Sequence, residues 1–181
     1  MQKITKENES LIIKYFKENK ILIMLTDTVY GIMALATKEN EIKINKLKKS
    51  NIDKKISIIF PNKEVLFKYL KNIDKEKEKI INQKLPGKYT LILNLKDFSN
   101  FKRDDFGIRI TTNKYLQNII EQVGPILATS CNISKEKICK NTEEIEEVFK
   151  NEDVILVMDK EANNKASTII DLTNDIKIIR K

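Results

Sequence analysis

The hydrophobic positions of the chain follow a helical period in some segments and form short continuous runs in others. Between Thr5 and Asn19 they recur at Leu11, Ile12, Tyr15 and Phe16, a spacing that predicts a helix. The run Ile21–Leu25 is instead continuous and short, which is typical of a strand buried on both faces. Further helices are predicted over Glu39–Lys49, Lys63–Lys71, Asp74–Gln83, Tyr115–Gln122 and Glu143–Lys150. For the last of these, Asn141 is predicted to cap the first turn, with Glu144 as its capping-box partner.

Strand patterns dominate the second half of the chain. Pro61 ends the run at Phe60, and Pro86-Gly87 ends the helical patterns that follow it. Strands and helices interleave without repeats or an obvious linker, which predicts one α/β (α+β) layered domain over residues 1–181 with a mixed sheet. The predicted strands are Ile56–Phe60, Thr90–Leu95, Gly107–Thr111, Ile126–Ser130, Val154–Asp159, Thr168–Leu172 and Ile176–Ile179.

The length and charge agree with one soluble domain. A chain of 181 residues buries roughly 70% of its unfolded surface as one domain. Its 34 Lys and Arg against 26 Asp and Glu give a net charge of +8, which attracts polyanions such as nucleic acid, nucleotides and anionic lipid. Nearly all of this charge is Lys, so a generally basic surface is favoured over a dedicated polyanion groove.

Several kinds of site are excluded by what the chain lacks. Cys131 and Cys139 are its two cysteines and it has no His, so neither a zinc cluster, a His-based triad nor a Cys-His nucleophile can be assembled. No apolar run reaches the ~20 residues that span a bilayer, and the segment MQKITKENES has no signal-peptide core. We therefore expect a cytoplasmic protein with no membrane partner and no metal site of its own.

Hydroxyl, amide and cationic side chains gather where predicted strands end. Neither a GxxxxGK[ST] loop nor a GxGxxG turn is present, so a bound nucleotide would have to be held without them. Such groups suit the positioning of charged substrates, and no activating base is visible for covalent catalysis. Each also has a plain structural reading, as a residue of high β propensity, a local turn or a surface lysine. The groups are Thr26, Thr28, Ser130, Asn132, Ser134, Ser167, Thr168, Lys48, Lys54, Arg109 and Arg180.

Arg109 is the least easily explained by structure alone. It stands inside the short apolar strand GIRI, where an unpaired buried charge would cost several kcal/mol. We therefore expect its guanidinium to meet an anion or a carboxylate.

Six segments that contain these residues follow one another along the chain: TDTVYG, LKKSNIDKKISIIF, LPGKYTLIL, FGIRI, ATSCNIS, and ASTIIDL with IIRK. Taken in this order, they resemble the YrdC-like family of threonylcarbamoyl-AMP synthases. The resemblance spans about Ile21 to Arg180, and six ordered segments are far more specific than any one of them.

The resemblance implies a single short-form domain, with a twisted mixed sheet flanked by helices around a concave basic cavity. It implies an enzyme that condenses L-threonine, bicarbonate and ATP, with Mg2+, into threonylcarbamoyl-AMP and pyrophosphate. Transferase partner proteins then pass the threonylcarbamoyl group to adenosine in tRNA. The residues that match the family's threonine site are Thr28, Arg109, Ser130 and Ser167, and those that match its ATP site are Lys48, Lys54, Asn132 and Arg180.

This sequence departs from the family pattern at several positions. Where the family has Lys-x-Arg, the chain has Lys48-Lys49-Ser50, so Lys49 or Lys54 would have to replace the arginine as point charges. Lys88, Cys131, Lys135 and Leu25 stand where the family has Pro, Ala, Gly and often Pro.

Two rival functions stay open at the level of sequence. The first is a non-catalytic RNA-binding or ribosome-associated module of the same fold, favoured by the missing arginine and the +8 charge and opposed by the retained threonine-side hydroxyls. The second is a carbamoyl-transfer domain related to hydrogenase maturation, weakened by the small size of the chain and the absence of zinc ligands.

Overall fold

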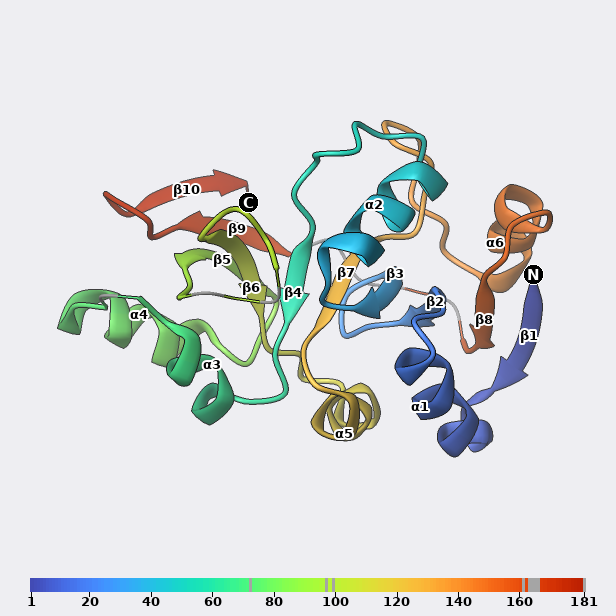
Figure 1. Ribbon diagram of the computed structural model, residues 1–181, viewed down its shortest axis with the longest axis horizontal. Helices are drawn as coiled ribbons and strands as arrows, with labels where there is room; N and C mark the ends of the chain where they lie inside the picture. The colour runs from blue at the N-terminus through green and yellow to red at the C-terminus, as the bar shows by residue number, and fades with distance from the viewer. Residues whose placement is uncertain (72, 97, 99, 161, 163–166, 181) are drawn as a thin grey trace.

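One mixed sheet runs through the whole molecule (Figure 1). The computed structural model describes residues 1–71, 73–96, 98, 100–160, 162 and 167–180. Among these residues the helices are α1 (Glu9–Lys17), α2 (Lys38–Leu47), α3 (Lys63–Tyr69), α4 (Lys75–Lys84), α5 (Lys114–Val123) and α6 (Thr142–Phe149), with a 3-10 turn at Lys6–Asn8. The strands are β1 (Gln2–Thr5), β2 (Leu22–Leu25), β3 (Tyr30–Leu35), β4 (Ser57–Ile59), β5 (Tyr89–Asn94), β6 (Asp105–Arg109), β7 (Ile126–Ser130), β8 (Ile155–Met158), β9 (Thr168–Asp171) and β10 (Lys177–Arg180).

The strand order brings distant parts of the chain together. It is β1-β8-β2-β3-β7-β4-β6-β5-β9-β10, so β1 and β10 form the two edges and lie at opposite ends of Figure 1. Four strand pairs are parallel, namely β1 with β8, β8 with β2, β4 with β6, and β5 with β9, and the other pairs are antiparallel. The predicted mixed α/β sheet is thereby confirmed.

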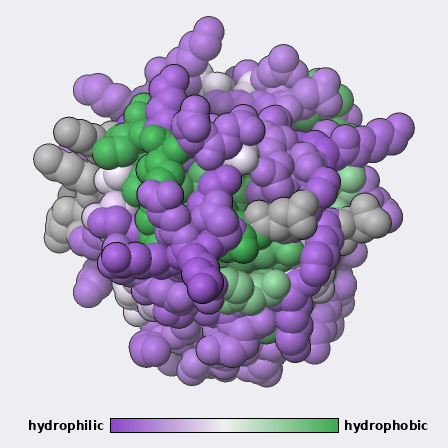
Figure 2. Space-filling model, turned by 90° about the vertical axis from the view of Figure 1, so that its left-hand side faces the viewer, coloured by the Kyte–Doolittle hydropathy of each residue, from purple (hydrophilic) through white to green (hydrophobic). Residues whose placement is uncertain are grey.

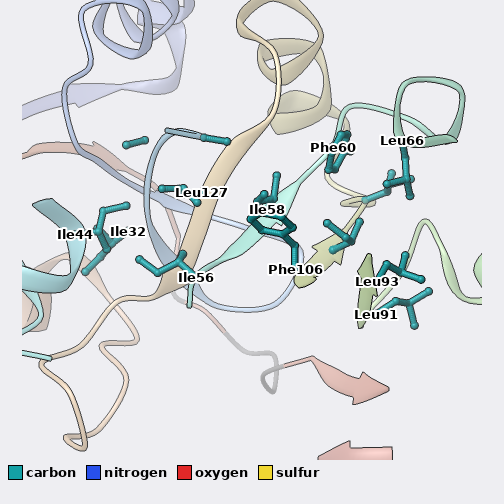
Figure 3. Close-up of a cluster of buried hydrophobic side chains, with 14 of the residues drawn as sticks. Ile32, Ile44, Ile56, Ile58, Phe60, Leu66, Leu91, Leu93, Phe106 and Leu127 are labelled. Atoms are coloured by element: carbon teal, nitrogen blue, oxygen red, sulfur yellow. The ribbon is translucent and has the colours of Figure 1, made fainter. Parts of the chain in front are cut away.

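Each face of the sheet has its own apolar cluster. Figure 3 shows the larger one, where side chains of β3, β4, β5, β6 and β7 meet Ile44 of α2 and Leu66 of α3. On the opposite face, α1 and α5 lie side by side and bury Phe16 and Ile120 against Met24, Met33 and Ile59. We call this second set the α1–α5 cluster; it covers only part of its face.

Two strands were not expected from the sequence. Residues 2–5 fall just before the predicted Thr5–Asn19 helix, yet they pair in parallel with β8, which lies far away in the chain. Tyr30–Leu35 follows Ile21–Leu25 after four residues and pairs back on it as a hairpin, with Leu25 opposite Tyr30. Both strands depend on a partner strand, and a four-residue edge segment carries too little local pattern to predict.

Helix starts follow the predicted chemistry. The Asn141 side chain accepts a hydrogen bond from Glu144 N at 2.9 Å, as the capping prediction required. The Glu144 carboxylate accepts its bond from Lys140 N, at 2.7 Å, rather than from the cap residue itself. The cap is therefore confirmed, with its reciprocal bond displaced by one residue.

Viewed from the β10 end, the surface is mostly hydrophilic but carries apolar side chains as well (Figure 2). Ile176, Ile178 and Ile179, in or beside β10, are 44%, 54% and 52% exposed. Within the described residues, no helix is both long and apolar enough to cross a bilayer.

Candidate functional site

A cavity of about 290 Å³ lies on the sheet face that α1 and α5 leave partly open. Side chains alternate between the two faces of a strand, and several cavity residues stand two positions from a member of the α1–α5 cluster. Thr26 follows Met24 in this way, Gly31 precedes Met33, and Ser57 precedes Ile59. The cavity is lined by Thr26, Thr28, Val29, Gly31, Lys54, Lys55, Ile56, Ser57, Thr90, Arg109, Ala128, Thr129, Ser130, Ile138, Ser167, Ile169 and Arg180.

The segment TDTV forms the turn of the hairpin between β2 and β3. Thr26 Oγ1 donates to Val29 O at 2.7 Å and accepts from Thr28 N at 3.0 Å and Val29 N at 3.1 Å. The Thr26 hydroxyl therefore stabilises the turn through these hydrogen bonds, a common role for Thr at such positions. Thr28, only 1% exposed, also lines the cavity, and its Oγ1 lies 2.9 Å from Thr26 Oγ1.

Arg109 is held in a fixed orientation at the end of β6. Its Nη2 donates to Asp27 Oδ1 at 2.8 Å and its Nη1 donates to Thr28 Oγ1 at 3.1 Å. Asp27 is thus the carboxylate that Arg109 was expected to meet, and the expectation is confirmed. The Arg109 Nε atom is buried and has no hydrogen-bond partner among the described residues.

The charge of Arg109 is crowded as well as buried. Burial lowers the pKa of Arg109, the Asp27 carboxylate opposes that effect, and the nearby Arg180 guanidinium lowers it further. Two guanidinium groups therefore act on one small cavity. An anion placed there would be attracted by both.

Gly107 leaves room for two side chains that line the cavity, those of Ser57 and Thr90. It lies two residues before Arg109 on β6 and therefore on the same face. A Cβ added to Gly107 would come within 2.8 Å of Ser57 Oγ and 3.1 Å of Thr90 Cγ2. Any larger residue would push these lining side chains into the cavity or aside.

Ser167 joins the β5 and β10 sides of the cavity. Its Oγ lies 2.7 Å from Thr90 Oγ1, and its carbonyl accepts from Arg180 Nε at 3.1 Å and Nη2 at 2.7 Å. Arg180 thus reaches over from the edge strand β10 to the cavity through two bonds to one backbone oxygen. The Ser167 side chain itself is buried, with the residue 6% exposed.

Lys48 braces the turn that follows β7 from behind the cavity wall. Its Nζ donates to Ser130 O, to Asn132 O at 2.7 Å and to Asn132 Oδ1 at 2.9 Å. The residue is only 2% exposed, which differs from the surface lysine that sequence alone suggested. Burial lowers the pKa of Lys48 to about 8, and the charge of Lys54 adds to the effect.

The Asn132 side chain is also fully engaged in the same turn. Its Oδ1 accepts from Ser130 Oγ at 2.7 Å as well as from Lys48, and its Nδ2 donates to Ile133 O at 2.7 Å and Glu136 O at 2.9 Å. Asn132 and Lys48 therefore fix the shape of the wall from which Ser130 faces the cavity.

Lys54 and Lys55 supply positive charge on the side where the family arginine is missing. Both line the cavity, and Lys55 also forms an ion pair with Asp105. Ser50, at the arginine position, donates its hydroxyl to Asn45 O and Asn45 Oδ1 at the end of α2. It is engaged with the helix, not with the cavity.

The structure brings most of the predicted site residues together. Thr28, Arg109, Ser130 and Ser167 line one cavity with Lys54 and Arg180, whereas Lys48 and Asn132 lie behind its wall. Asp27, Lys55, Ser57 and Thr90 were not predicted from the sequence as site residues. All four lie inside segments that resemble the family: Asp27 in TDTVYG, Lys55 and Ser57 in LKKSNIDKKISIIF, and Thr90 in LPGKYTLIL.

No carboxylate lines the cavity among the described residues, and no group of three or more Cys, Asp and Glu side chains there is arranged to hold a metal. The polar groups that line the cavity are instead hydroxyls and cations. Such a set fits Mg2+ only as an ion carried on the phosphates of a nucleotide, which supply its oxygen ligands.

Comparison with known protein families gives one match that covers most of the chain. A family model with the name Sua5/YciO/YrdC and the description Telomere recombination matches residues 14–181. A Methanocaldococcus jannaschii protein, provisionally named threonylcarbamoyl-AMP synthase, is 33% identical over 184 residues, covering 97% of this chain and 87% of its own. A Vibrio campbellii threonylcarbamoyl-AMP synthase is 25% identical over 174 residues, covering 91% and 94%.

Solved structures share the fold at lower identity. Escherichia coli YciO superposes with a TM-score of 0.86 at 19% identity, over 99% of this chain and 93% of its own. P. abyssi Sua5, solved in complex with L-threonine, superposes with a TM-score of 0.86 at 24% identity. The match covers 99% of this chain and 56% of that Sua5 chain, so the present chain spans just over half its length.

Proposed function

Since the chain belongs to the Sua5/YciO/YrdC family, we propose that it is an enzyme that joins L-threonine, bicarbonate and ATP into threonylcarbamoyl-AMP, releasing pyrophosphate. The names of the curated relatives support the enzyme over a non-catalytic RNA-binding module. The observation that carries the proposal is the fixed guanidinium of Arg109, with its unpaired Nε, in a small cavity lined by hydroxyls.

Arg109 and the hydroxyls suit an amino acid that carries its own hydroxyl. A carboxylate that meets the Arg109 guanidinium would form charge-assisted hydrogen bonds, which are stronger than neutral ones. Thr28, Ser130 and Ser167 then lie within the same cavity for the amine and hydroxyl of threonine. A P. abyssi relative has been solved with L-threonine, which supports this choice of ligand.

Lys54, Lys55 and Arg180 would receive the triphosphate. Three cations on one cavity can offset the charge that develops on the leaving pyrophosphate. Mg2+ bound to the phosphates would neutralise part of the same charge.

The chain's contribution to the rate is positioning. The threonine amine attacks the carbon of bicarbonate, whose C–O bond breaks so that one oxygen leaves as water and a carbamate remains. A carbamate oxygen then attacks the α-phosphorus of ATP while pyrophosphate leaves. Both steps join charged reactants that repel or diffuse apart in water. Holding them in one cavity contributes on the order of 7 kcal/mol or more to lowering the barrier.

With this activity, the protein would supply the substrate for transfer of a threonylcarbamoyl group to tRNA. Threonylcarbamoyl-AMP is a reactive mixed anhydride, so a partner protein that transfers its threonylcarbamoyl group to an adenosine of tRNA would consume it. Partner transferases, and tRNA or other RNA, are the interactions we propose on this ground. The cytoplasmic location stays a prediction.

Pyrophosphate release tests the proposal. Purified protein with ATP, Mg2+ and bicarbonate should release pyrophosphate only when L-threonine is added, and D-threonine or L-serine should support a lower rate. A rate that does not depend on threonine would contradict the proposal. Thermal stabilisation by threonine distinguishes the proposed enzyme from the rival RNA-binding module, because a module that binds only RNA should not be stabilised by threonine.

A further inference from the structure

The two cysteines of the chain lie against each other beside the candidate site. Cys131 directly follows β7, and Cys139 N donates a hydrogen bond to Cys131 O at 2.8 Å across the intervening loop. Both are free, and they are 0% and 4% exposed. The hydrogen bond between the two thiols is the largest influence on each: it raises the pKa of Cys131 and lowers the pKa of Cys139.

Cys139 is the cysteine that lies nearer to solvent, 4% exposed against 0% for Cys131. It lines a second hollow, of about 820 Å³, whose walls include Val29, Ile138 and Ala162. Val29 and Ile138 also line the candidate cavity, so the two hollows share a wall. A lowered pKa and a position beside a hollow at the surface are features that favour reaction of a thiol.

Cys131 is a feature of this chain rather than of the family segment it resembles, which has alanine at this position. A lone thiol at Cys139 could be oxidised only to a sulfenic acid or beyond, whereas two adjacent thiols can stop at a disulfide. The backbone hydrogen bond from Cys139 N to Cys131 O holds the two main chains in contact, so the side chains start within the reach of a disulfide.

We propose that Cys131 and Cys139 are a redox modification site, at which a peroxide forms a reversible disulfide that lowers the activity of the neighbouring cavity. The effect on activity rests on the proposed function, whereas formation of the bond does not.

The oxidation balances with one peroxide molecule. The Cys139 thiolate attacks one peroxide oxygen, the O–O bond breaks, and hydroxide leaves, so Cys139 becomes a sulfenic acid. The Cys131 sulfur then displaces the sulfenic oxygen, which leaves as water with the available protons. The two sulfurs are oxidised by two electrons in all, and the peroxide is reduced to two water molecules. A small thiol reverses the bond by exchange.

The disulfide would act on the cavity through the turn that Lys48 braces. A disulfide brings its sulfurs to about 2.05 Å, far closer than two thiols in contact, so Cys131 or Cys139 must move. Cys131 lies between Ser130 and Asn132, whose carbonyls both accept from Lys48. A displacement of about 1 Å in this turn would move the Ser130 hydroxyl out of position and lower the rate by about tenfold or more.

A count of free thiols tests whether the disulfide forms, and an activity assay tests separately whether the disulfide inhibits the enzyme. After treatment with hydrogen peroxide, the unfolded wild type should have lost both thiols without forming a disulfide-linked dimer, and dithiothreitol should restore them. Threonine-dependent pyrophosphate release should fall by about tenfold on oxidation and recover on reduction.

Cys131→Ala is the matched control, because it restores the alanine of the family segment and leaves Cys139 in place. This variant should keep its activity at peroxide doses that inactivate the wild type, and dimedone should trap its Cys139 sulfenic acid. Cys139→Ala provides a second variant and should likewise form no disulfide. Both thiols remaining free in oxidised wild type would overturn the proposal whatever the activity. A disulfide that leaves activity unchanged, or equal inactivation of Cys131→Ala, would overturn the regulatory part.

Discussion

Arg109 shows how single residues define the candidate site. Its two Nη atoms are committed to Asp27 and Thr28, so the orientation of the guanidinium is set before any ligand arrives. Preorganised charge of this kind costs little reorganisation when an anion binds. Asp27 is a positioning residue in this arrangement, since it touches Arg109 and not the cavity space.

Arg109→Lys should weaken L-threonine binding by about ten- to a hundredfold, because lysine keeps the charge but loses the fork that donates to Asp27 and Thr28 together. Titration calorimetry with L-threonine measures the change. Arg103→Lys is the control. Arg103 forms a two-bond pair with Glu41 away from the cavity, so its loss should lower stability and leave threonine affinity unchanged. Equal losses of affinity in both variants would argue against an Arg109-centred site.

Lys48 should make stability depend on pH in the alkaline range. Burial lowers its pKa from 10.5 to about 8, so between those values it binds a proton in the unfolded chain but not in the folded one. The unfolded state then binds more protons, and the unfolding free energy rises with pH across this window. Relative to Lys48→Met, which lacks this group, the wild type should gain stability from pH 8 to 10.5. Denaturant titrations at several pH values measure the difference, and a constant difference would contradict the assignment.

At the scale of elements, the site depends on strand alternation. The cavity face of β6 carries Gly107 and Arg109, while Ile108 between them points into the larger core. Three consecutive residues of the pattern GIRI therefore differ in role: Gly107 leaves room for lining side chains, Ile108 packs in the core, and Arg109 supplies a fixed cation.

Gly107→Ala should weaken L-threonine binding while the protein still folds. The added methyl would crowd Ser57 Oγ and Thr90 Cγ2, and overpacking of this kind costs about 1–3 kcal/mol. Gly124→Ala is the matched control. Gly124 has φ of +86° and an open surrounding, so alanine there should lower stability by about 1 kcal/mol through backbone strain and leave threonine affinity unchanged. Unaltered threonine affinity in Gly107→Ala would contradict the placement of threonine in the cavity that Ser57 and Thr90 line.

The sequence predicted the elements better than it predicted their partners. The run Ile21–Leu25 and the period around Leu116, Ile119 and Ile120 are local signals, and they correspond to β2 and α5. β1 was missed because its pairing with β8 joins residues about 150 positions apart. Asp27 was missed as a positioning residue because its partner Arg109 lies 82 residues away.

The burial of Lys48 could not be predicted from the sequence for the same reason. Its burial depends on the carbonyls of Ser130 and Asn132, and nothing in the residues around Lys48 distinguishes it from the exposed lysines. Resemblance to a family identified these residues as a set, and the structure explains the physical role that each one has in the wall.

At the scale of the whole molecule, the sheet brings residues from seven strands and four loops together around one cavity. Part of the net charge of +8 is concentrated at the cavity, because four Lys and Arg residues line it: Lys54, Lys55, Arg109 and Arg180. This concentration of charge is what a triphosphate substrate requires.

Identification of the product tests the central claim most directly. Protein incubated with ATP, Mg2+, L-threonine and 13C-bicarbonate should form threonylcarbamoyl-AMP with the label in its carbamoyl carbon, as detected by mass spectrometry, and Arg109→Lys should form much less at limiting threonine. If a threonylcarbamoyl-AMP synthase run in parallel makes the labelled product while this folded protein makes none, the account of the cavity as a site for threonylcarbamoyl-AMP synthesis is wrong.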